Sequence, residues 1–411
     1  MAVERFTPYQ RKLFIFLSVA AFFEGYDFMA FSQVLTDLAR DMTLSETEKG
    51  AMYAVISAGT VVALLLVRLA DTWGRRRVLS ITIAGYTLFT FLTGLAPEAY
   101  SFTIAQFLAR VFLIGEWAIS MVYAAEEYPA SRRGTVVGII QGFTALGSIV
   151  CAGVAPILIK TAYGWRTVYF VAVIPLVLIM YARRNLKETQ RFLDQVDTKA
   201  TKRRSFFHIF TTPHRGWVFK LGLIWGLMYL CSNVAVTFWK DFAITERGLT
   251  GGQAGLSISL AALIAMPMVL YSGKLMDQIG RRWGGALIFT SGSLGVMLSY
   301  TLHGQWPLTA ALILGVFGAS AMPAVLNILT TELFPTALRA DAFAWCNNLV
   351  GRIGYVTAPY LVGVASGALG EKGPVLAISA VFPIIATLLL LVMVPETKGR
   401  ELEDTSAVEA R

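Results

Sequence analysis

Long apolar runs dominate this chain and restrict what it can fold into. There are twelve of them, each roughly 20 residues long, which is the length needed to cross about 30 Å of hydrocarbon. The runs cover residues 12–38, 50–69, 78–96, 100–124, 136–160, 165–183, 216–240, 253–273, 284–303, 307–331, 340–363 and 374–395. Because lipid offers no hydrogen-bond partner to the backbone, such runs form helices or closed barrels. Barrel strands would alternate in short segments, so we predict an all-α membrane protein with 12 transmembrane helices.

Composition supports this class. Hydrophobic residues make up 56% of the 411 residues and charged residues only 15%, whereas a soluble chain carries about 25% charged residues. Lys and Arg gather in alternate loops, at Arg75–Arg77, Arg132–Arg133, Arg281–Arg282 and Arg339. Basic loops mark the cytoplasmic side, so we expect a multi-pass protein of the bacterial inner membrane, the plasma membrane, with both termini cytoplasmic. The net charge of +9 is then topology charge, and we expect no nucleic-acid partner.

Two charged loops recur later in the chain with one common offset. Four residues of the first loop return 206 positions on, as do three of the second, one of which is Pro129, repeated as Pro335. In the first loop Asp71, Gly74, Arg75 and Arg76 become Asp277, Gly280, Arg281 and Arg282, and in the second Glu126 and Arg133 become Glu332 and Arg339. The chain therefore consists of two homologous halves, which in a membrane indicates a transporter with its site between the repeats.

The repeat also sets the predicted domain boundaries. We expect an N-terminal six-helix bundle over 1–183, a cytoplasmic linker over 184–215, a C-terminal six-helix bundle over 216–395 and a cytoplasmic tail over 396–411.

These motifs resemble those of the major facilitator superfamily over nearly the whole chain. The first loop reads Leu69-Ala-Asp-Thr-Trp-Gly-Arg-Arg-Arg77, with Arg68 near the place where the family usually has Gly. The other matches are Glu126-Glu-Tyr-Pro-Ala-Ser-Arg-Arg133 and Pro395-Glu-Thr-Lys-Gly-Arg400. The resemblance implies two pseudo-symmetric six-helix bundles that expose a central site alternately to each side. It also implies that charged loop residues clamp the cytoplasmic side and act as gates: Asp71, Arg75, Arg76, Glu126, Arg133, Asp277, Arg281, Arg282, Glu332 and Arg339. The alternative is that Arg75–Arg77 only set topology.

Four charged residues lie well inside the first and fourth apolar runs, away from the ends of those runs: Glu24, Asp27, Arg110 and Glu116. Charge inside a membrane is costly and marks a functional site by default. Glu24 and Asp27 lie three residues apart, hence on one helix face, so mutual repulsion and burial favour proton uptake by at least one of them. We therefore predict that these four residues couple transport to protons. The alternatives are a hydrogen-bonded Asp27 at a loosened turn and a permanent buried ion pair for Arg110.

Arg352 is the most telling substrate clue, because it stands in an apolar run with no nearby acid in the sequence. Its fork of donors suits a carboxylate bidentately, although it could instead pair with Asp27 or another acid. Polar and aromatic residues could complete a binding cavity. These are Tyr26, Gln141, Trp225, Tyr229, Asn233, Asn327, Trp345, Asn347 and Asn348.

Within the superfamily, two segments resemble one branch. Asn347-Asn-Leu-Val-Gly-Arg-Ile-Gly-Tyr355 is similar to a segment of organic-anion and aromatic-acid transporters, in which an Arg at this place meets an anionic substrate. Glu24-Gly-Tyr-Asp27 resembles the Asp-Gly-x-Asp of aromatic acid:proton symporters, with Glu in place of the first Asp. Arg110 with Gly115 resembles the helix-four motif that the family links to proton transfer.

Several other functions lack the residues they need. No phosphate-binding Gly-x-x-x-x-Gly-Lys-Ser/Thr loop is present, so nothing indicates ATP. The histidines, His208, His214 and His303, form no metal-ligand spacing, and no nucleophile–base arrangement suggests an enzyme. We expect no cofactor and no metal.

We therefore predict proton-coupled uptake of a small organic anion, such as an aromatic or other carboxylic acid. Its partners would be this substrate, protons and the lipid bilayer, and we expect a monomer. One alternative is a sugar or polyol symporter that uses Gln141, Asn233 and Asn327 as neutral hydrogen-bonding groups. Others are an exporter or facilitated exchanger without proton coupling, and a sensor that binds solute without moving it.

Overall fold

The computed structural model describes residues 6–171, 173, 177, 187–188, 207–335 and 338–398. The side chains of Asp71 and Arg133 lie outside this description, as do most of the predicted linker and tail. The chain forms two compact units. Unit 1 comprises Met1–Met42 and Val55–Thr201, and unit 2 comprises Thr43–Ala54 and Lys202–Arg411.

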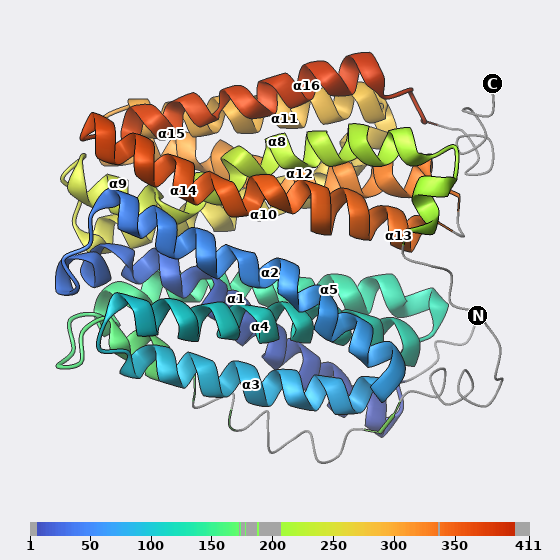
Figure 1. Cartoon of the computed structure of the whole chain (residues 1–411), viewed down its shortest axis with the longest axis horizontal. Helices are drawn as coiled ribbons and strands as arrows, with labels where there is room; N and C mark the ends of the chain where they lie inside the picture. The colour runs from blue at the N-terminus through green and yellow to red at the C-terminus, as the bar shows by residue number, and fades with distance from the viewer. Residues whose placement is uncertain are drawn as a thin grey trace. The chain divides into compact units, whose positions relative to one another are not determined.

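Unit 1 is built from long helices (Figure 1). These are α1 (Pro8–Asp41), α2 (Glu46–Trp73), α3 (Arg75–Leu95), α4 (Ala99–Glu127) and α5 (Ala130–Leu158), and residues 166–171 are helical as well. Residues Thr43–Ala54, which include the first turns of α2, belong to unit 2. Helix α1 begins at a capping box in which Thr7 accepts from the Gln10 amide while Gln10 accepts from the Thr7 amide, which satisfies two otherwise unpaired donors.

Helices α1 and α5 touch backbone to backbone. A Cβ atom on Gly25 would lie 1.8 Å from the Thr144 carbonyl oxygen, and one on Gly147 would lie 1.8 Å from the Phe22 carbonyl oxygen. Only glycine fits at these two positions, because any side chain would push the helices apart. This contact fixes the helix that carries Glu24 and Asp27.

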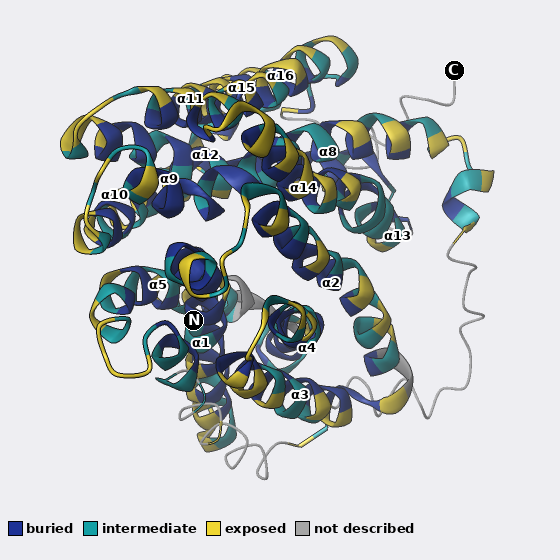
Figure 2. Ribbon diagram, turned by 60° about the vertical axis from the view of Figure 1, so that its left-hand side comes forward, coloured by how far each residue is buried: buried dark blue, intermediate teal, exposed yellow. Residues whose placement is uncertain are grey.

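Unit 2 is also helical (Figure 1). Its elements are η2 (His208–Thr211), α8 (Arg215–Thr237), α9 (Trp239–Thr245), α10 (Gly251–Ile279), α11 (Arg281–Thr301), α12 (Gln305–Leu333), α13 (Arg339–Phe343), η3 (Ala344–Gly351), α14 (Arg352–Leu369), α15 (Gly373–Ser379) and α16 (Val381–Met393). Within each unit the buried residues line the inward faces of the helices, and exposed ones the outward faces (Figure 2).

Nine helices of the described residues are long and apolar enough to cross a membrane. They correspond to nine of the twelve predicted runs. Of the other three, 284–303 is the helix α11, which carries more small and polar residues. The run 340–363 is divided into α13, η3 and α14 by a change of helix type. The run 165–183 begins as a helix at 166–171, and most of its remainder lies outside the described residues.

Candidate functional site

Arg352 is held between two aromatic rings of unit 2. It is the first residue of α14, and its guanidinium carbon lies 4.6 Å from the centre of the Tyr355 ring and 5.2 Å from that of Tyr229. A guanidinium over an aromatic face is stabilised by the ring quadrupole. The side chain is half-buried, and its Nε atom is buried without a hydrogen-bond partner among the described residues. No carboxylate of a described residue in unit 2 lies within 4.0 Å of it.

The backbone just before Arg352 is unusual. Residues 344–351 form a π-helix, η3. This wider turn occurs mostly as a short insertion within an α-helix, and such insertions are frequent at functional sites. Two glycines let this segment approach α8 closely. A Cβ on Gly351 would lie 2.6 Å from Trp225 Cβ, and one on Gly354 would lie 2.2 Å from the Gly226 carbonyl oxygen. The close approach places Arg352 beside the aromatic face of α8.

Amide side chains position the ring beside Arg352. The Tyr229 hydroxyl donates to Asn347 Oδ1 at 2.7 Å, and the Asn233 amide donates to the Tyr355 carbonyl oxygen at 2.9 Å. The Tyr229 and Tyr355 rings meet edge to face with centroids 5.2 Å apart. These contacts hold an aromatic wall around a cation that has an unused donor, which is the chemistry that a planar carboxylate needs.

The other predicted binding residues of unit 2 have different environments from that of Arg352. Trp225 packs on Tyr229 with ring centroids 5.4 Å apart, and its indole N–H is buried without a partner among the described residues. The Trp345 ring packs against the Phe210 ring, with centroids 4.6 Å apart. Asn348 is half-buried in η3, and Asn327 lies on an exposed face of α12.

In unit 1, the four predicted proton-coupling residues are buried together. Exposed fractions are 7% for Glu24, 2% for Asp27, and 3% for both Arg110 and Glu116. Arg110 is within electrostatic range of Glu24 and Asp27, and Glu116 is within range of Glu24. The described buried residues of this cluster thus include three acids and one guanidinium, which acts on two of the acids.

The partners of these charges are incomplete. Asp27 Oδ1 and Arg110 Nη1 are buried with no hydrogen-bond partner in the described part of the chain. Arg110 instead lies over the Phe28 ring, 4.6 Å from its centre, and Glu116 accepts from the Ser120 hydroxyl at 2.6 Å. Among the described contacts, Asp27 and Arg110 therefore do not form the permanent ion pair that was the alternative prediction.

The remaining predicted residues of unit 1 are engaged with the protein. Tyr26 is buried and its hydroxyl donates to the Val168 carbonyl oxygen at 3.2 Å. The Gln141 amide contacts the Met121 sulfur at 3.7 Å. Neither contact involves the four buried charges.

The charged loops of the two halves have the same geometry. Arg75 Nη2 lies 3.3 Å from Glu126 Oε1 in unit 1, and Arg281 Nη2 lies 3.1 Å from Glu332 Oε1 in unit 2. Each guanidinium also donates to the carbonyl oxygen five residues earlier. The repeat seen in the sequence is thus a repeat of ion pairs.

Other predicted gating residues complete the loop of unit 2. Asp277 lies 2.7 Å from Arg281, and Arg282 donates to the Leu391 carbonyl oxygen. Arg339 Nε donates to the carbonyl oxygens of Thr331 and Phe334 at 2.9 and 3.1 Å.

The sequence analysis missed one carboxylate in each half. Glu188 accepts from the backbone N–H groups of Arg75 and Arg76, and Glu396 accepts from those of Arg281 and Arg282. Each carboxylate caps the start of a helix, where unpaired N–H groups and the helix dipole favour negative charge. Burial alone raises the pKa of Glu396, but these backbone donors outweigh it and hold that pKa below its ordinary value. A Glu-Thr pair follows the last apolar run of each half, as Glu188-Thr189 and Glu396-Thr397, and this repeat could have indicated the two carboxylates.

A glycine at the same loop has no substitute. Gly280 has φ +99° and ψ 161°, a region that only glycine adopts readily, and a Cβ there would lie 2.6 Å from the Glu396 carboxylate. We expect Gly280→Ala to destabilise the protein by about 1–3 kcal/mol. The matched control is Gly273→Ala in α10, where a Cβ meets nothing within 4 Å and alanine should be neutral or slightly stabilising. Thermal unfolding in detergent measures both, and equal melting temperatures would contradict the prediction.

Comparison with known proteins gives consistent results. The Major Facilitator Superfamily profile matches residues 17–359. A protein of Cupriavidus pinatubonensis named "Probable 4-methylmuconolactone transporter" is 27% identical, covering 98% of this chain and 95% of its own. The cis,cis-muconate transport protein of Acinetobacter baylyi is 26% identical, covering 86% and 87%. Among solved structures, that of a D-xylose-proton symporter matches with a TM-score of 0.76 at 20% identity, covering 95% of this chain and 99% of its own.

Proposed function

Because the chain belongs to the major facilitator superfamily, and so is a multi-pass membrane transporter rather than an enzyme, we propose that it takes up a small organic anion together with protons. The substrate is an aromatic or other unsaturated carboxylic acid. The two six-helix halves rock and expose the binding site alternately to each side, which moves the substrate across the bacterial inner membrane. Both termini face the cytoplasm, and the protein acts as a monomer.

The environment of Arg352 is the observation that carries this proposal. The guanidinium lies between the Tyr229 and Tyr355 rings, and its Nε has no partner among the described residues. A half-buried cation with a free donor is stabilised when an anion arrives, because the anion supplies both charge and hydrogen-bond acceptors. The rings add stacking area for a planar substrate. Relatives named for muconate and methylmuconolactone support this class of substrate.

Neutral sugars fit the same residues less well. The side-chain amide of Asn233 already donates to the Tyr355 carbonyl oxygen, and its oxygen accepts from Tyr53 at 2.7 Å. Asn327 lies on an exposed face of α12. A sugar site depends on several free amide groups, whereas an anion site depends chiefly on the free cation.

The buried acids of unit 1 provide the proton coupling. With Glu24, Asp27 and Glu116 all ionised, Arg110 would leave an excess of two negative charges in a buried site. Unpaired buried charge is strongly unfavourable, so protons must neutralise part of it. Asp27 carries the coupling proton, since its Oδ1 is unpartnered among the described residues and Arg110 lies within electrostatic range.

Uptake into proteoliposomes tests the proposal. We expect radiolabelled cis,cis-muconate or benzoate to accumulate when the outside is more acidic, and D-xylose not to enter. If the acids enter but only reach equal concentrations on both sides, the protein is an anion facilitator and not a proton symporter. Entry of D-xylose, with no entry of either acid, would refute the anion proposal.

A further inference from the structure

Within unit 2, two glycines let the start of α2 pack tightly against α14. A Cβ on Gly50 would lie 2.4 Å from the Pro359 carbonyl oxygen, and one on Gly363 would lie 2.8 Å from the Glu46 carbonyl oxygen. The backbones of α2 and α14 are therefore in direct contact. Residues 43–54 belong to unit 2, although α2 continues without interruption into Val55–Trp73 of unit 1.

A polar contact lies next to this crossing. The Tyr53 hydroxyl donates to Asn233 Oδ1 at 2.7 Å and accepts from the Thr237 hydroxyl at 3.0 Å. Thr237 is the last residue of α8 and is 7% exposed. The first turns of α2 thus cover the end of α8.

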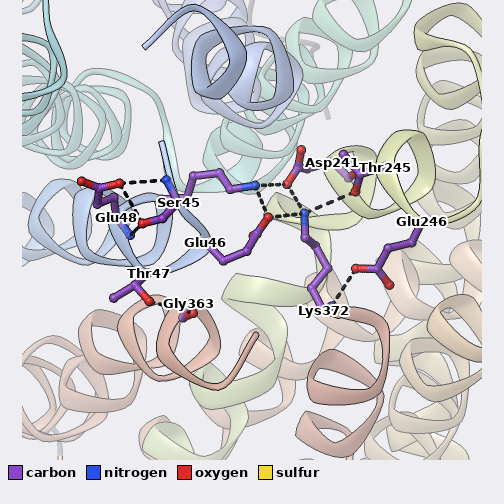
Figure 3. Close-up of polar contacts among 10 residues, drawn as sticks. Ser45, Glu46, Thr47, Glu48, Asp241, Thr245, Glu246, Gly363 and Lys372 are labelled. Carbon is purple, nitrogen blue, oxygen red and sulfur yellow. Dashed lines mark hydrogen bonds and ion pairs between the residues drawn. The ribbon is translucent and has the colours of Figure 1, made fainter. Parts of the chain in front are cut away.

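Four charged side chains close the contact (Figure 3). Lys49 Nζ lies 2.6 Å from Glu46 Oε1 and 2.9 Å from Asp241 Oδ2. Lys372 Nζ contacts the same two carboxylates, at 3.1 and 2.5 Å. Two cations and two anions therefore alternate in a ring, and we call these four residues the latch. The side chains of Lys49, Asp241 and Lys372 are at most 5% exposed.

The latch is electrically neutral only when it is complete. Glu46 and Lys49 come from α2, whereas Asp241 comes from α9 and Lys372 precedes α15. Burial alone raises the pKa of Asp241, but Lys372 and Lys49 outweigh it and hold that pKa below its ordinary value. The carboxylate is therefore ionised, and its buried charge depends on both lysines.

A buried ionic ring is a weak way to stabilise a permanent contact, because the desolvation of four charges offsets most of their attraction. It is well suited to a contact that opens, since water can solvate all four groups once they separate. An apolar patch of the same area would expose hydrocarbon each time.

We propose that the latch is a gate of the transporter on the face opposite the Arg281 loop, and that it opens once in each transport cycle. Helix α10 has 29 residues and is about 44 Å long, so its two ends lie on opposite faces of a hydrocarbon layer of about 30 Å. Helix α9, which carries Asp241 of the latch, precedes α10, and Gly280 and Arg281 follow the last residue of α10. Opening lifts the start of α2 from α14 and uncovers the end of α8.

Thiol labelling tests the latch without any substrate, so the result does not depend on the proposed function. Thr237→Cys is introduced and treated in intact cells with a membrane-impermeant maleimide. The native thiols Cys151, Cys231 and Cys346 are buried. We expect Lys49→Gln to increase the labelling rate about tenfold or more, because breaking a buried ion pair shifts an equilibrium strongly. This variant leaves Asp241 paired with Lys372, so unit 2 keeps its internal ion pair.

Glu48→Gln is the matched control. Glu48 lies next to Lys49 but is exposed, and among the described residues it hydrogen-bonds to Ser45, so the Glu48→Gln variant should be labelled at the rate of the parent. Equal rates for Lys49→Gln and the parent would overturn the proposal.

A disulfide provides a second measurement if Lys49→Gln fails to reach the membrane. A Cβ on Gly367 would lie 2.8 Å from Thr47 Oγ1, so Thr47→Cys with Gly367→Cys joins α2 to α14. We expect the oxidised double variant to lose cis,cis-muconate counterflow and to recover it with reductant. Unchanged counterflow in the oxidised protein would show that the latch need not open.

Discussion

Replacing Arg352 with alanine should abolish binding of the organic anion. The substitution removes the only charge between the Tyr229 and Tyr355 rings in the described structure, and the substrate carboxylate then enters a half-buried site with no counter-charge. Loss of a buried, hydrogen-bonded charge pair costs about 2–5 kcal/mol, which weakens binding by about 30-fold to several thousand-fold. Binding can be measured by the rise in melting temperature with cis,cis-muconate or benzoate.

Two further variants make this measurement specific. Arg352→Lys keeps the charge but loses the planar fork of donors, so we expect only partial recovery of affinity. Arg215→Ala removes an exposed arginine from α8, the helix that carries Tyr229, and should bind as the parent does. Parent affinity in Arg352→Ala would exclude Arg352 as the anchor.

Replacing Asp27 with asparagine should separate substrate movement from proton movement. The amide is similar in size but cannot take up and release a proton, so exchange of labelled for unlabelled substrate continues. Net accumulation should cease. A gradient of one pH unit is worth about 1.4 kcal/mol per proton, enough for the parent to concentrate substrate about tenfold, whereas the variant should only reach equality.

The control for this variant lies on the same helix. Asp37 is ten residues further along α1 and is partly exposed, so Asp37→Asn should still accumulate substrate. If Asp27→Asn also concentrates substrate against its gradient, Asp27 is not the carrier, and Glu24 or Glu116 becomes the next candidate.

The sequence predicted the fold well because its strongest signals are local. Apolar runs specify spanning helices through their length alone, and the resemblance assigned the family that the profile match then showed. The repeated loops contain charges that meet in the structure, although the sequence did not specify the individual pairs. Arg75 meets Glu126, and Arg281 meets Glu332, at nearly equal distances.

The details of the candidate site were harder to foresee. Lys49, Asp241 and Lys372 come from three distant segments, and no spacing in the sequence links them. The π-helix before Arg352 depends on which carbonyl each N–H selects, and hydrophobic periodicity does not record that choice. Trp345 was predicted to line the binding cavity, and in the structure its ring packs on Phe210.

The π-helix has a further consequence for Arg352. An ordinary helix advances by about 100° per residue, and a segment with wider turns puts everything after it out of phase with everything before it. Should Ala344–Gly351 tighten to the usual winding, α14 would have to rotate about its own axis relative to α13. Arg352, as the first residue beyond the segment, would then swing its guanidinium away from the tyrosine pair. A change in the winding of this segment would therefore alter the distance between the Arg352 guanidinium and the two tyrosine rings.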